Sequence, residues 1–450
     1  MLDLSLRECA DVLNAELIGG DVEFSSVSTD TRTLKTGQLM VALVGEKFDA
    51  HEKIDAEVAS KAAGFVVQRQ LPFSQPQLVV QDTLRALGDI ARVWRNRISA
   101  PVVAITGSNG KTTVKEMTAA ILRECGKVFY TQGNLNNEIG LPLSVLSIDK
   151  RHEFVVLELG ANHAGEIDYL THIAKPLVAL VNNAGPSHLE GFGSLDGVAH
   201  AKAEIYNGLS DNGVAIINAD DHYAPLWREC IGEHRMLSFG VEERADVTGR
   251  KMSGDVVQIV FEGQSVEFFL PLPGQHNLMN ALAAASAGLA VGASLEQIAQ
   301  GLSKIQATRG RLEFKAGRHG IQLLDDSYNA NPASLQAGLD VLCDAADGRR
   351  ICVLGEMREL GDRAAQMHRS MGAAAREQGV DLLFSLGTFA TELAEGFGVG
   401  ARAFDDIDEL IEALDDTLTD GDWVLVKGSR GARMERVVQA LIVDQQEGNR

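Results

Sequence analysis

The chain has 450 residues and a formal net charge of −21 at pH 7, with 45% hydrophobic and 23% charged residues. This length exceeds that of one compact core and predicts roughly two to four domains. The composition is that of a globular protein and excludes a disordered or fibrous one. Because the charge balance lacks the basic footprint of a nucleic-acid binder, we expect no nucleic-acid partner.

Five widely spaced cysteines without a C-x-x-C pair favour neither a disulfide framework nor a zinc site. The charged N-terminal sequence lacks the apolar segment of a signal peptide. The longest stretch of low charge, residues 280–294, is short for a membrane span and has the composition of a buried helix. We therefore expect a cytoplasmic protein without stable membrane insertion.

The N-terminal region, residues 1–82, has the pattern of a small α/β domain. A polar, turn-rich segment at 27–32 precedes an apolar run at 39–44, a helical pattern at 56–63 and an apolar run at 64–67. A longer helical pattern covers 83–97 and ends before Pro101, which disfavours helix at the preceding residue. We expect the first domain boundary at the start of this helix.

The central region, residues 83–311, alternates apolar runs with helical patterns. The runs lie at 102–106, 127–130, 154–159, 177–182 and 213–218. Apolar runs separated by helices indicate parallel strands that are buried on both faces. Alternating apolar and polar residues at 246–270 predict an antiparallel annex, and helices follow from Asn277.

A third region, residues 312–450, repeats this alternation with apolar runs at 321–324, 350–354, 381–386 and 423–426. It predicts a second doubly wound unit, and we expect residues 444–450 to fray. The expected fold is therefore α/β with three domains. These are a small N-terminal α/β domain, a central doubly wound and mostly parallel sheet with a P-loop, and a C-terminal Rossmann-like α/β domain.

Residues 102–113, VVAITGSNGKTT, place a glycine-rich turn between an apolar strand and a helix. The turn lets successive N–H groups converge, and the helix N-terminus adds a positive dipole end, which together form a nest for phosphate oxygens. Lys111 is expected to reach the β and γ phosphates, and Thr112 to bind Mg²⁺. Ile105 stands where the standard G-x-x-x-x-G-K-[ST] pattern has its first glycine. The candidate nucleotide-binding residues here are Gly107, Ser108, Asn109, Gly110, Lys111, Thr112 and Thr113.

Beyond the loop, the sequence offers one candidate for binding the cation and two further polar residues of open role. Glu158 lies near the carboxyl end of the run at 154–159, the end at which open α/β sheets bind ligands, and is a Mg²⁺ candidate. His188 lies in a loop, where histidine is also commonly solvated or structural. Lys202, on a helical pattern at 195–209, has the sequence setting of an exposed lysine.

Several longer runs cover nearly the whole chain. They are GNLNNEIGLP at 133–142, LELGANHAGEI at 157–167, HLEGFGS at 188–194, AKAEIY at 201–206, LPGQHNLMNALAAA at 272–285, DDSYNANPAS at 325–334, GEMRELG at 355–361 and VKGSRGARME at 426–435. Together with TGSNGKTT they resemble the Mur ligase family of peptidoglycan-precursor amide ligases, and within it the dipeptide-adding branch. The D-N-P-R motif of the diaminopimelate-adding branch is absent.

The resemblance implies a division of labour among three domains: 1–82 for the UDP-sugar, 83–311 for ATP, and 312–450 closing over ATP and the incoming dipeptide. It implies ATP and two Mg²⁺ ions, with Thr112, Glu158 and His188 among the metal ligands. Lys202 is expected to be carbamylated, which gives an anionic oxygen ligand to the second ion. Lys111, His188 and Lys202 are the expected catalytic residues.

The resemblance also implies the other contacts with ATP and the substrates. Asn277 and Asn280 are expected on the adenine side, Arg309 near the phosphates, and Asp326 at the ribose, with Asp325 close enough to confuse the assignment. The expected substrate residues are Ser28, Thr29, Asp30 and Arg32 for the uridine nucleotide, Asn134 and Asn137 for the sugar–peptide, and Tyr328, Asn329 and Arg430 for the dipeptide. Ordinary turn polarity is the alternative reading of these groups.

The implied reaction is ATP-dependent addition of D-alanyl-D-alanine to UDP-N-acetylmuramoyl-tripeptide through an acyl phosphate. Another Mur-type or a folylpolyglutamate-type ligase is one alternative, against which VSTDTR and DDSYNANP argue. A non-catalytic ATP-binding regulator is another, against which the joint presence of Lys111, Glu158, His188 and Lys202 argues. Three internal domains suffice to build the site, so we expect a monomer.

Overall fold

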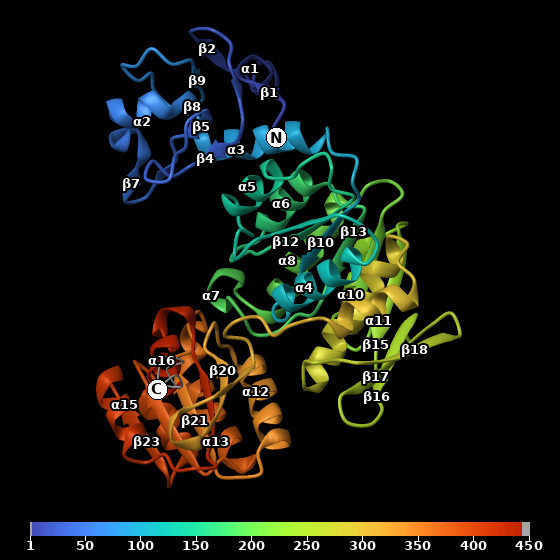
Figure 1. Cartoon of the computed structure of the whole chain (residues 1–450), viewed down its shortest axis with the longest axis vertical. Coiled ribbons are helices and arrows are strands. Elements are labelled where there is room, and N and C mark those ends of the chain that lie inside the picture. The colour runs from blue at the N-terminus through green and yellow to red at the C-terminus, as the bar shows by residue number, and fades with distance from the viewer. Residues whose placement is uncertain (1, 443–450) are drawn as a thin grey trace, which may run out of the picture.

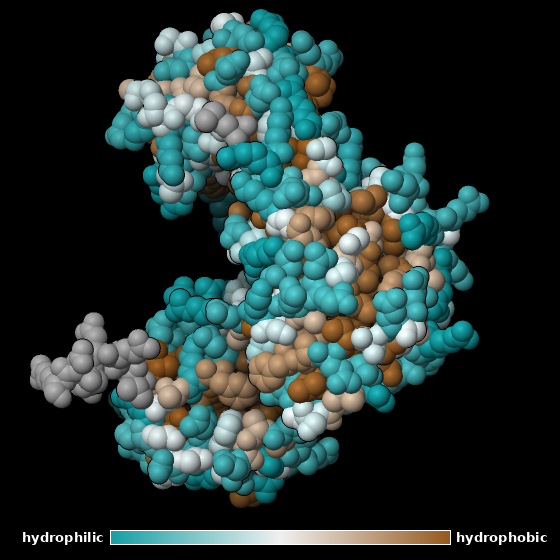
Figure 2. Space-filling view, turned by 45° about the vertical axis from the view of Figure 1, so that its right-hand side comes forward, coloured by the Kyte–Doolittle hydropathy of each residue, from teal (hydrophilic) through white to brown (hydrophobic). Residues whose placement is uncertain are grey.

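The computed structural model of the chain describes residues 2–442. Its main sheets have five, nine and six strands, and each is formed by a separate stretch of the sequence. The predicted α/β fold with three domains is confirmed (Figure 1). The segment expected to fray, 444–450, lies outside the described residues. The two end domains flank a hollow that opens onto the central domain (Figure 2).

The N-terminal sheet has the order β2-β9-β8-β5-β4, and two further strand pairs, β1–β3 and β6–β7, are antiparallel. Asp55 caps α2 by accepting from the Val58 N–H at 2.9 Å. The elements are β1 (Leu4–Ser5), α1 (Leu6–Leu13), β2 (Glu16–Ile18), β3 (Glu23–Phe24), β4 (Val27–Ser28), β5 (Gln38–Val41), β6 (Val44–Gly45), β7 (Phe48–Asp49), η1 (Ala50–Lys53), α2 (Ala56–Lys61), β8 (Ala62–Val67) and β9 (Gln77–Val79).

Helix α3 (Thr83–Arg95) joins the first two sheets. Asp82 caps its start, and its buried stripe includes Leu87, Ile90 and Trp94. One core cluster contains this stripe together with residues of α1 and of the central sheet. The Trp94 indole N–H also donates to the Ile148 carbonyl at 2.9 Å, so α3 is packed against both domains.

The central sheet has the order β11-β12-β10-β13-β14-β15-β16-β17-β18 and is parallel from β11 to β16. Strands β16, β17 and β18 are antiparallel to one another, which confirms the expected annex. The strands are β10 (Val102–Thr106), β11 (Val128–Tyr130), β12 (Phe154–Glu158), β13 (Val178–Val181), β14 (Val214–Asn218), β15 (Arg235–Gly240), β16 (Val247–Lys251), β17 (Val256–Phe261) and β18 (Gln264–Phe269).

Strand residues alternate between two cores, as expected for a sheet that is covered on both faces. Val103 and Ile105 pack with the helices α4, α10 and α11, whereas Val102 and Ala104 pack with α3, α5 and α6. The remaining elements of this region are α4 (Lys111–Arg123), α5 (Gly140–Leu146), α6 (Glu166–Ala174), α7 (Leu189–Phe192), α8 (Leu195–Ala203), η2 (Glu204–Gly208), α9 (Ala224–Ile231), α10 (Gln275–Ala290) and α11 (Leu295–Ser303).

The C-terminal sheet has the order β19-β20-β24-β21-β22-β23 and is parallel except for the edge strand β19. Its strands are β19 (Glu313–Ala316), β20 (Gln322–Asp326), β21 (Arg350–Gly355), β22 (Leu382–Leu386), β23 (Ala401–Phe404) and β24 (Trp423–Lys427). Its helices are η3 (Arg318–Gly320), α12 (Pro332–Ala345), η4 (Gly361–Arg363), α13 (Ala364–Glu377), α14 (Ala390–Phe397), α15 (Ile407–Asp415), η5 (Arg430–Ala432) and α16 (Glu435–Leu441).

Candidate active site at the phosphate loop

The phosphate loop joins the carboxyl end of β10 to the start of α4. Gly107 and Gly110 both have positive φ, +151° and +77°. A Cβ atom at Gly110 would lie 2.4 Å from Asn280 Oδ1 and 2.6 Å from Asn182 Nδ2. Only glycine fits there, because the loop backbone is pressed against polar side chains while its N–H groups form the start of a helix.

Lys111 is the first residue of α4, and its side chain turns back over the loop. Its Nζ donates to the Gly107 carbonyl at 2.5 Å and to the Ser108 carbonyl at 3.2 Å. Burial lowers the pKa of Lys111, and the nearby Glu158 carboxylate opposes that shift. The ammonium thus lies inside the loop, where a phosphate oxygen would meet it.

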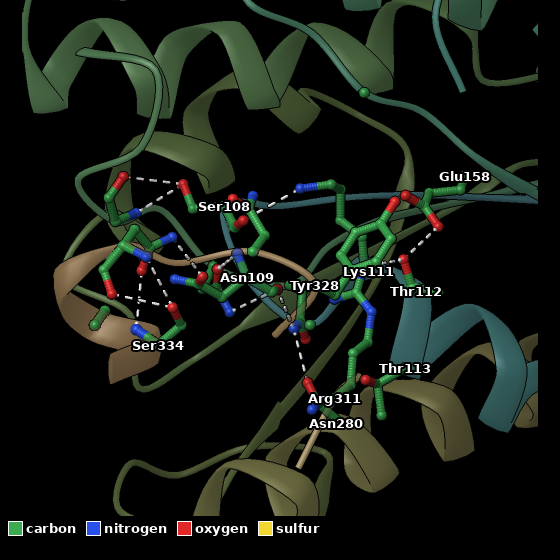
Figure 3. A pocket seen from close by; sticks show the side chains of 18 of the residues that line it. Ser108, Asn109, Lys111, Thr112, Thr113, Glu158, Asn280, Arg311, Tyr328 and Ser334 are labelled. Carbon is green, nitrogen blue, oxygen red and sulfur yellow. Dashed lines mark hydrogen bonds between the residues drawn. The ribbon is translucent and has the colours of Figure 1, made fainter. Parts of the chain in front are cut away.

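Asparagine side chains hydrogen-bond to the phosphate loop and to one another; Asn109 and Asn280 are labelled in Figure 3. The Asn109 N–H donates to Asn183 Oδ1 at 2.8 Å, and the Asn182 amide donates to the Asn109 carbonyl at 3.0 Å. The same Asn182 amide donates to Asn280 Oδ1, and the Asn280 amide to Asn277 Oδ1. Asn182 and Asn183 were not among the predicted site residues. Their position directly after β13, at the carboxyl end of a central parallel strand, could have identified them as site residues.

Glu158 lies at the end of β12 and is only 3% exposed. The Thr112 hydroxyl donates to its Oε2 at 2.9 Å, and the Asn136 amide donates to its Oε1 at 2.7 Å. Two of the predicted metal ligands, Thr112 of the loop and Glu158 of β12, are therefore hydrogen-bonded to each other. Asn136 was missed, although it lies between the predicted residues Asn134 and Asn137. A carboxylate and a hydroxyl are the hard oxygen donors that suit Mg²⁺.

His188 and Lys202 both lie near the Phe192 ring. The Lys202 Nζ is 5.2 Å from that ring's centroid, and the His188 ring meets it edge-on at 6.4 Å. Lys202 is 1% exposed, and burial, with a smaller effect of Lys111, lowers its pKa to about 7. The reading of Lys202 as an exposed lysine is therefore wrong. His188 Nδ1 contacts the Glu359 carboxylate of the C-terminal domain, a partner that was not predicted.

The C-terminal domain, together with Arg311 directly before it, contributes charged residues to the same cavity. Lys427 forms a buried ion pair with Asp326, and its Nζ also donates to the Asn329 carbonyl at 2.9 Å. Arg311 places its guanidinium 4.3 Å from the Tyr328 ring centroid and donates to the Thr112 hydroxyl at 3.1 Å (Figure 3). Arg311 was missed, because its loop gives no periodicity by which to orient a side chain.

The cavity enclosed by these groups has a volume of about 860 Å³. The predicted residues that line it are Ser108, Asn109, Gly110, Lys111, Thr112, Thr113, Asn134, Asn137, Glu158, His188, Asn277, Asn280, Asp326, Tyr328 and Asn329. Those that do not line it are Gly107, Lys202, Arg309, Arg430, Ser28, Thr29, Asp30 and Arg32. Arg430 stands close by, 6.0 Å from the Tyr328 ring centroid, and pairs with Glu435.

The predicted uridine-nucleotide residues lie apart from this cavity, on the N-terminal domain. The Arg32 guanidinium donates to both carboxylate oxygens of Asp30, at 2.9 and 2.7 Å. These hydrogen bonds lower the pKa of Asp30 to about 2. The Asp30 N–H in turn donates to the Ser28 hydroxyl at 3.2 Å, which gives a structured turn after β4. That these residues bind the uridine nucleotide stays a prediction.

The fold and the loop define the class: a nucleotide-binding α/β protein with a P-loop, whose C-terminal domain closes one side of the phosphate site. Comparison with known protein families identifies the family. The pattern of the Mur ligase middle domain matches residues 105–288, and that of the Mur ligase, glutamate ligase domain matches residues 310–430. The chain belongs to the Mur ligase family.

The similarity to individual relatives extends over nearly the full length of the chain. UDP-N-acetylmuramoyl-tripeptide–D-alanyl-D-alanine ligase of Escherichia coli is 44% identical over 98% of this chain and 99% of its own. The crystal structure of MurF from Acinetobacter baumannii has a TM-score of 0.90 at 35% identity, covering 96% of this chain and 97% of that one. MurF ligase from Thermotoga maritima in complex with ADP has a TM-score of 0.83 at 28% identity, covering 92% and 96%.

Proposed function

We propose that the chain adds D-alanyl-D-alanine to UDP-N-acetylmuramoyl-tripeptide at the expense of ATP, the last cytoplasmic peptide step of the peptidoglycan precursor. One observation carries the proposal. The phosphate loop, with Lys111 and the Thr112–Glu158 pair, faces the same cavity as Tyr328 and Asn329. The names of relatives that match the chain from end to end identify the two substrates.

The three domains divide the work in this proposal. Residues 1–82 hold the UDP-sugar, residues 83–311 hold ATP, and residues 312–450 close over ATP and the dipeptide. The hollow between the end domains supports this division, since a long nucleotide-linked peptide has to reach from the first domain to the phosphate loop (Figure 2). Three internal domains suffice to build the site, so we propose a monomer.

A carboxylate is a poor electrophile, and the chemistry has to supply it with a leaving group. The terminal carboxylate of the tripeptide attacks the γ-phosphorus of ATP, which gives an acyl phosphate and ADP. The dipeptide amine then attacks the acyl carbon, an amide forms and phosphate leaves. Two anions must approach each other in the first step, and the Lys111 ammonium offsets their repulsion. Surrounding asparagine amides orient the loop without adding charge.

The donor set at the loop fits a divalent cation. Thr112 and Glu158 would hold one Mg²⁺, and His188 with a carbamylated Lys202 would hold a second. Bound Mg²⁺ supplies positive charge that neutralises the phosphate oxygens. No group of three His, Cys, Asp or Glu side chains arranged for a metal occurs among residues 2–442, and a carbamate at Lys202 would supply further oxygen donors.

The burial of Lys202 favours such a modification. A lysine whose pKa is about 7 is partly an uncharged amine at neutral pH, and the uncharged amine is the form that adds to CO₂. Lys202→Ala should abolish phosphate release, and a small carboxylic acid or added bicarbonate should partly restore it. Full activity of this variant without any additive would reject the carbamate.

No described helix has the length and apolar character needed to cross a membrane. We place the reaction in the cytoplasm, where ATP and nucleotide-linked precursors are available. The five cysteines are free, as a reducing compartment favours.

The decisive experiment is a phosphate-release assay with each substrate omitted in turn. Release should require ATP, UDP-N-acetylmuramoyl-tripeptide and D-alanyl-D-alanine together. ATP turnover that ignores the dipeptide would reject the proposal. Turnover with glutamate in place of the dipeptide would favour a folylpolyglutamate-type reaction. A chain that binds ATP without any turnover would be a regulator.

A further inference from the structure

The side chain of Asn331 links the C-terminal domain to the phosphate loop. Asn331 precedes α12, and its Nδ2 donates to Asn109 Oδ1 at 2.7 Å. Asn109 belongs to the loop, 222 residues away in the sequence. Both residues are half-buried and line the cavity.

The carboxamide of Asn331 has two separate uses. Its Oδ1 accepts from the Ser334 N–H at 2.9 Å and so caps α12, while the Ser334 hydroxyl donates to the Asn331 carbonyl at 3.0 Å. The cap needs only the oxygen, as it does in serine or aspartate caps. The amide nitrogen is therefore left for the contact with Asn109, and a cap without an amide would not make it.

Asn109 is likewise held from two sides. Its backbone is fixed within the central domain, since its N–H donates to Asn183 and its carbonyl accepts from Asn182 and Asn183. Its side-chain oxygen is held by the C-terminal domain alone through Asn331. The loop's shape thus does not depend on Asn331, which adds a direct hydrogen bond between the C-terminal domain and the loop.

The segment just before Asn331 carries the residues proposed for the dipeptide. Tyr328 is anchored by its N–H to the Gly310 carbonyl at 3.0 Å, and the Asn329 carbonyl accepts from Lys427. Tyr328 and Asn329 lie three and two residues before Asn331 in the chain, so a shift of the start of α12 would act directly on both of them. We infer that Asn331 is a positioning residue that sets the distance between the dipeptide side of the cavity and the phosphate side. The inference rests on the proposed ligase function.

The test uses Asn331→Ser in the full chain. Serine keeps the helix cap but lacks the nitrogen that reaches Asn109. Loss of one neutral hydrogen bond should lower kcat/KM for D-alanyl-D-alanine about 3- to 10-fold. The Kd of a fluorescent ADP analogue and the melting temperature should not change, because the loop and the cap remain. Asn331→Ala removes the cap as well and should melt at a lower temperature.

A double-mutant cycle with Asn109→Ser separates this contact from other effects. Asn109→Ser/Asn331→Ser should be no slower than the slower single variant, since both remove the same hydrogen bond. Gln336→Ser is the matched control, because it removes an amide from the same helix whose hydrogen bond, to Asp340 at 3.0 Å, stays within α12. It should retain the wild-type kcat/KM.

Four results would overturn the inference. These are wild-type kinetics of Asn331→Ser, additive losses in the cycle, a loss that lies in nucleotide affinity, and an equal loss in the Gln336 control. Failure of the proposed function would be seen separately, as wild-type phosphate release that ignores the dipeptide, and the inference would fall with it.

Discussion

The two sides of the cavity are held together by different interactions. On the central-domain side, neutral amides form the framework that surrounds Lys111 and Glu158, with Asn109, Asn182, Asn183 and Asn280 joined by hydrogen bonds of 2.8 to 3.0 Å. On the C-terminal side, charges dominate. They are the buried pair Asp326–Lys427, the guanidinium of Arg311, directly before this domain, over Tyr328, and the Glu359 carboxylate, which contacts His188.

This difference predicts different weaknesses. A network of neutral hydrogen bonds around glycines depends on shape, and neither pH nor salt changes it much. A buried ion pair depends on the presence of both partners, because removal of one leaves an uncompensated charge. The phosphate side should therefore fail by steric change, and the C-terminal side by change of charge.

The largest effect is expected at Gly110. An alanine there adds a Cβ atom 2.4 Å from Asn280 Oδ1 on a backbone with φ of +77°. The loop has to move to accommodate it, so Gly110→Ala should lower kcat/KM for ATP by about a thousand-fold, or about 4 kcal/mol. Steady-state phosphate release measures this loss, and an ADP-analogue titration should show weaker binding.

Gly263→Ala is the matched control for that variant. Gly263 lies in the β17–β18 turn, also at φ of +77°, and a Cβ atom there meets nothing within 4 Å. It should cost about 1 kcal/mol in the free energy of unfolding and leave turnover unchanged. A loss of turnover equal to that of Gly110→Ala would show that backbone strain, not contact with the asparagines, causes the effect.

The next effect is expected at Lys427. Lys427→Met leaves the Asp326 carboxylate buried without its partner and should lower the free energy of unfolding by about 3 kcal/mol at pH 8. Burial already raises the pKa of Asp326 above 3.8, so the folded state binds that proton more tightly than the unfolded state. The free energy of unfolding therefore falls as the pH rises through that pKa. Urea unfolding should show a smaller loss at pH 5.

The double variant Asp326→Asn/Lys427→Met removes both charges of this pair and tests whether the unpaired carboxylate causes the loss of stability. Without the buried carboxylate, most of the lost stability should return, although turnover should not. If the double variant is as unstable as Lys427→Met, packing of the lysine stem and not its charge accounts for the loss.

Lys202, like Glu158, departs from this comparison, because it is an ionisable group buried on the central side. Its pKa is lowered from 10.5 to about 7, so between these values the unfolded chain binds a proton that the folded chain does not. The free energy of unfolding should therefore rise with pH across that window.

In buffer freed of bicarbonate, Lys202→Met should remove this rise and stabilise the protein by about 2 kcal/mol at pH 7, with loss of turnover. Lys61→Met, an exposed control, should do neither. An unchanged pH dependence in Lys202→Met would show that the amine is not the group that titrates.

The phosphate side was accessible from the sequence because its determinants are local. A strand, a glycine turn and Lys-Thr follow one another within residues 102–113, and the predicted runs coincide closely with β10 to β14. Strand β15 was missed, because its first residues, Arg235 and Met236, are exposed and interrupt the apolar pattern. Arrangements that join distant segments, such as Asn331 with Asn109 or Glu359 with His188, have no signature in either segment alone.

Arg309 and Arg311 illustrate the same limit at the scale of two residues. The family resemblance points to Arg309, whereas Arg311 lines the cavity and contacts Thr112. The Arg311 Nε is buried and has no hydrogen-bond partner among the described residues, so it is available to a phosphate oxygen.

The smallest effect is expected from lysine at these two positions. Lysine keeps the charge but lacks the flat guanidinium that stacks on Tyr328 and donates in a fork. Arg311→Lys should lower kcat/KM for ATP about tenfold, or about 1.4 kcal/mol, and Arg309→Lys less than about twofold. Phosphate release at subsaturating ATP measures both. The reverse order would restore the role of Arg309 and would mean that the segment 309–311 rearranges around the nucleotide, because in this structure it is Arg311, of these two arginines, that donates to Thr112 of the phosphate loop.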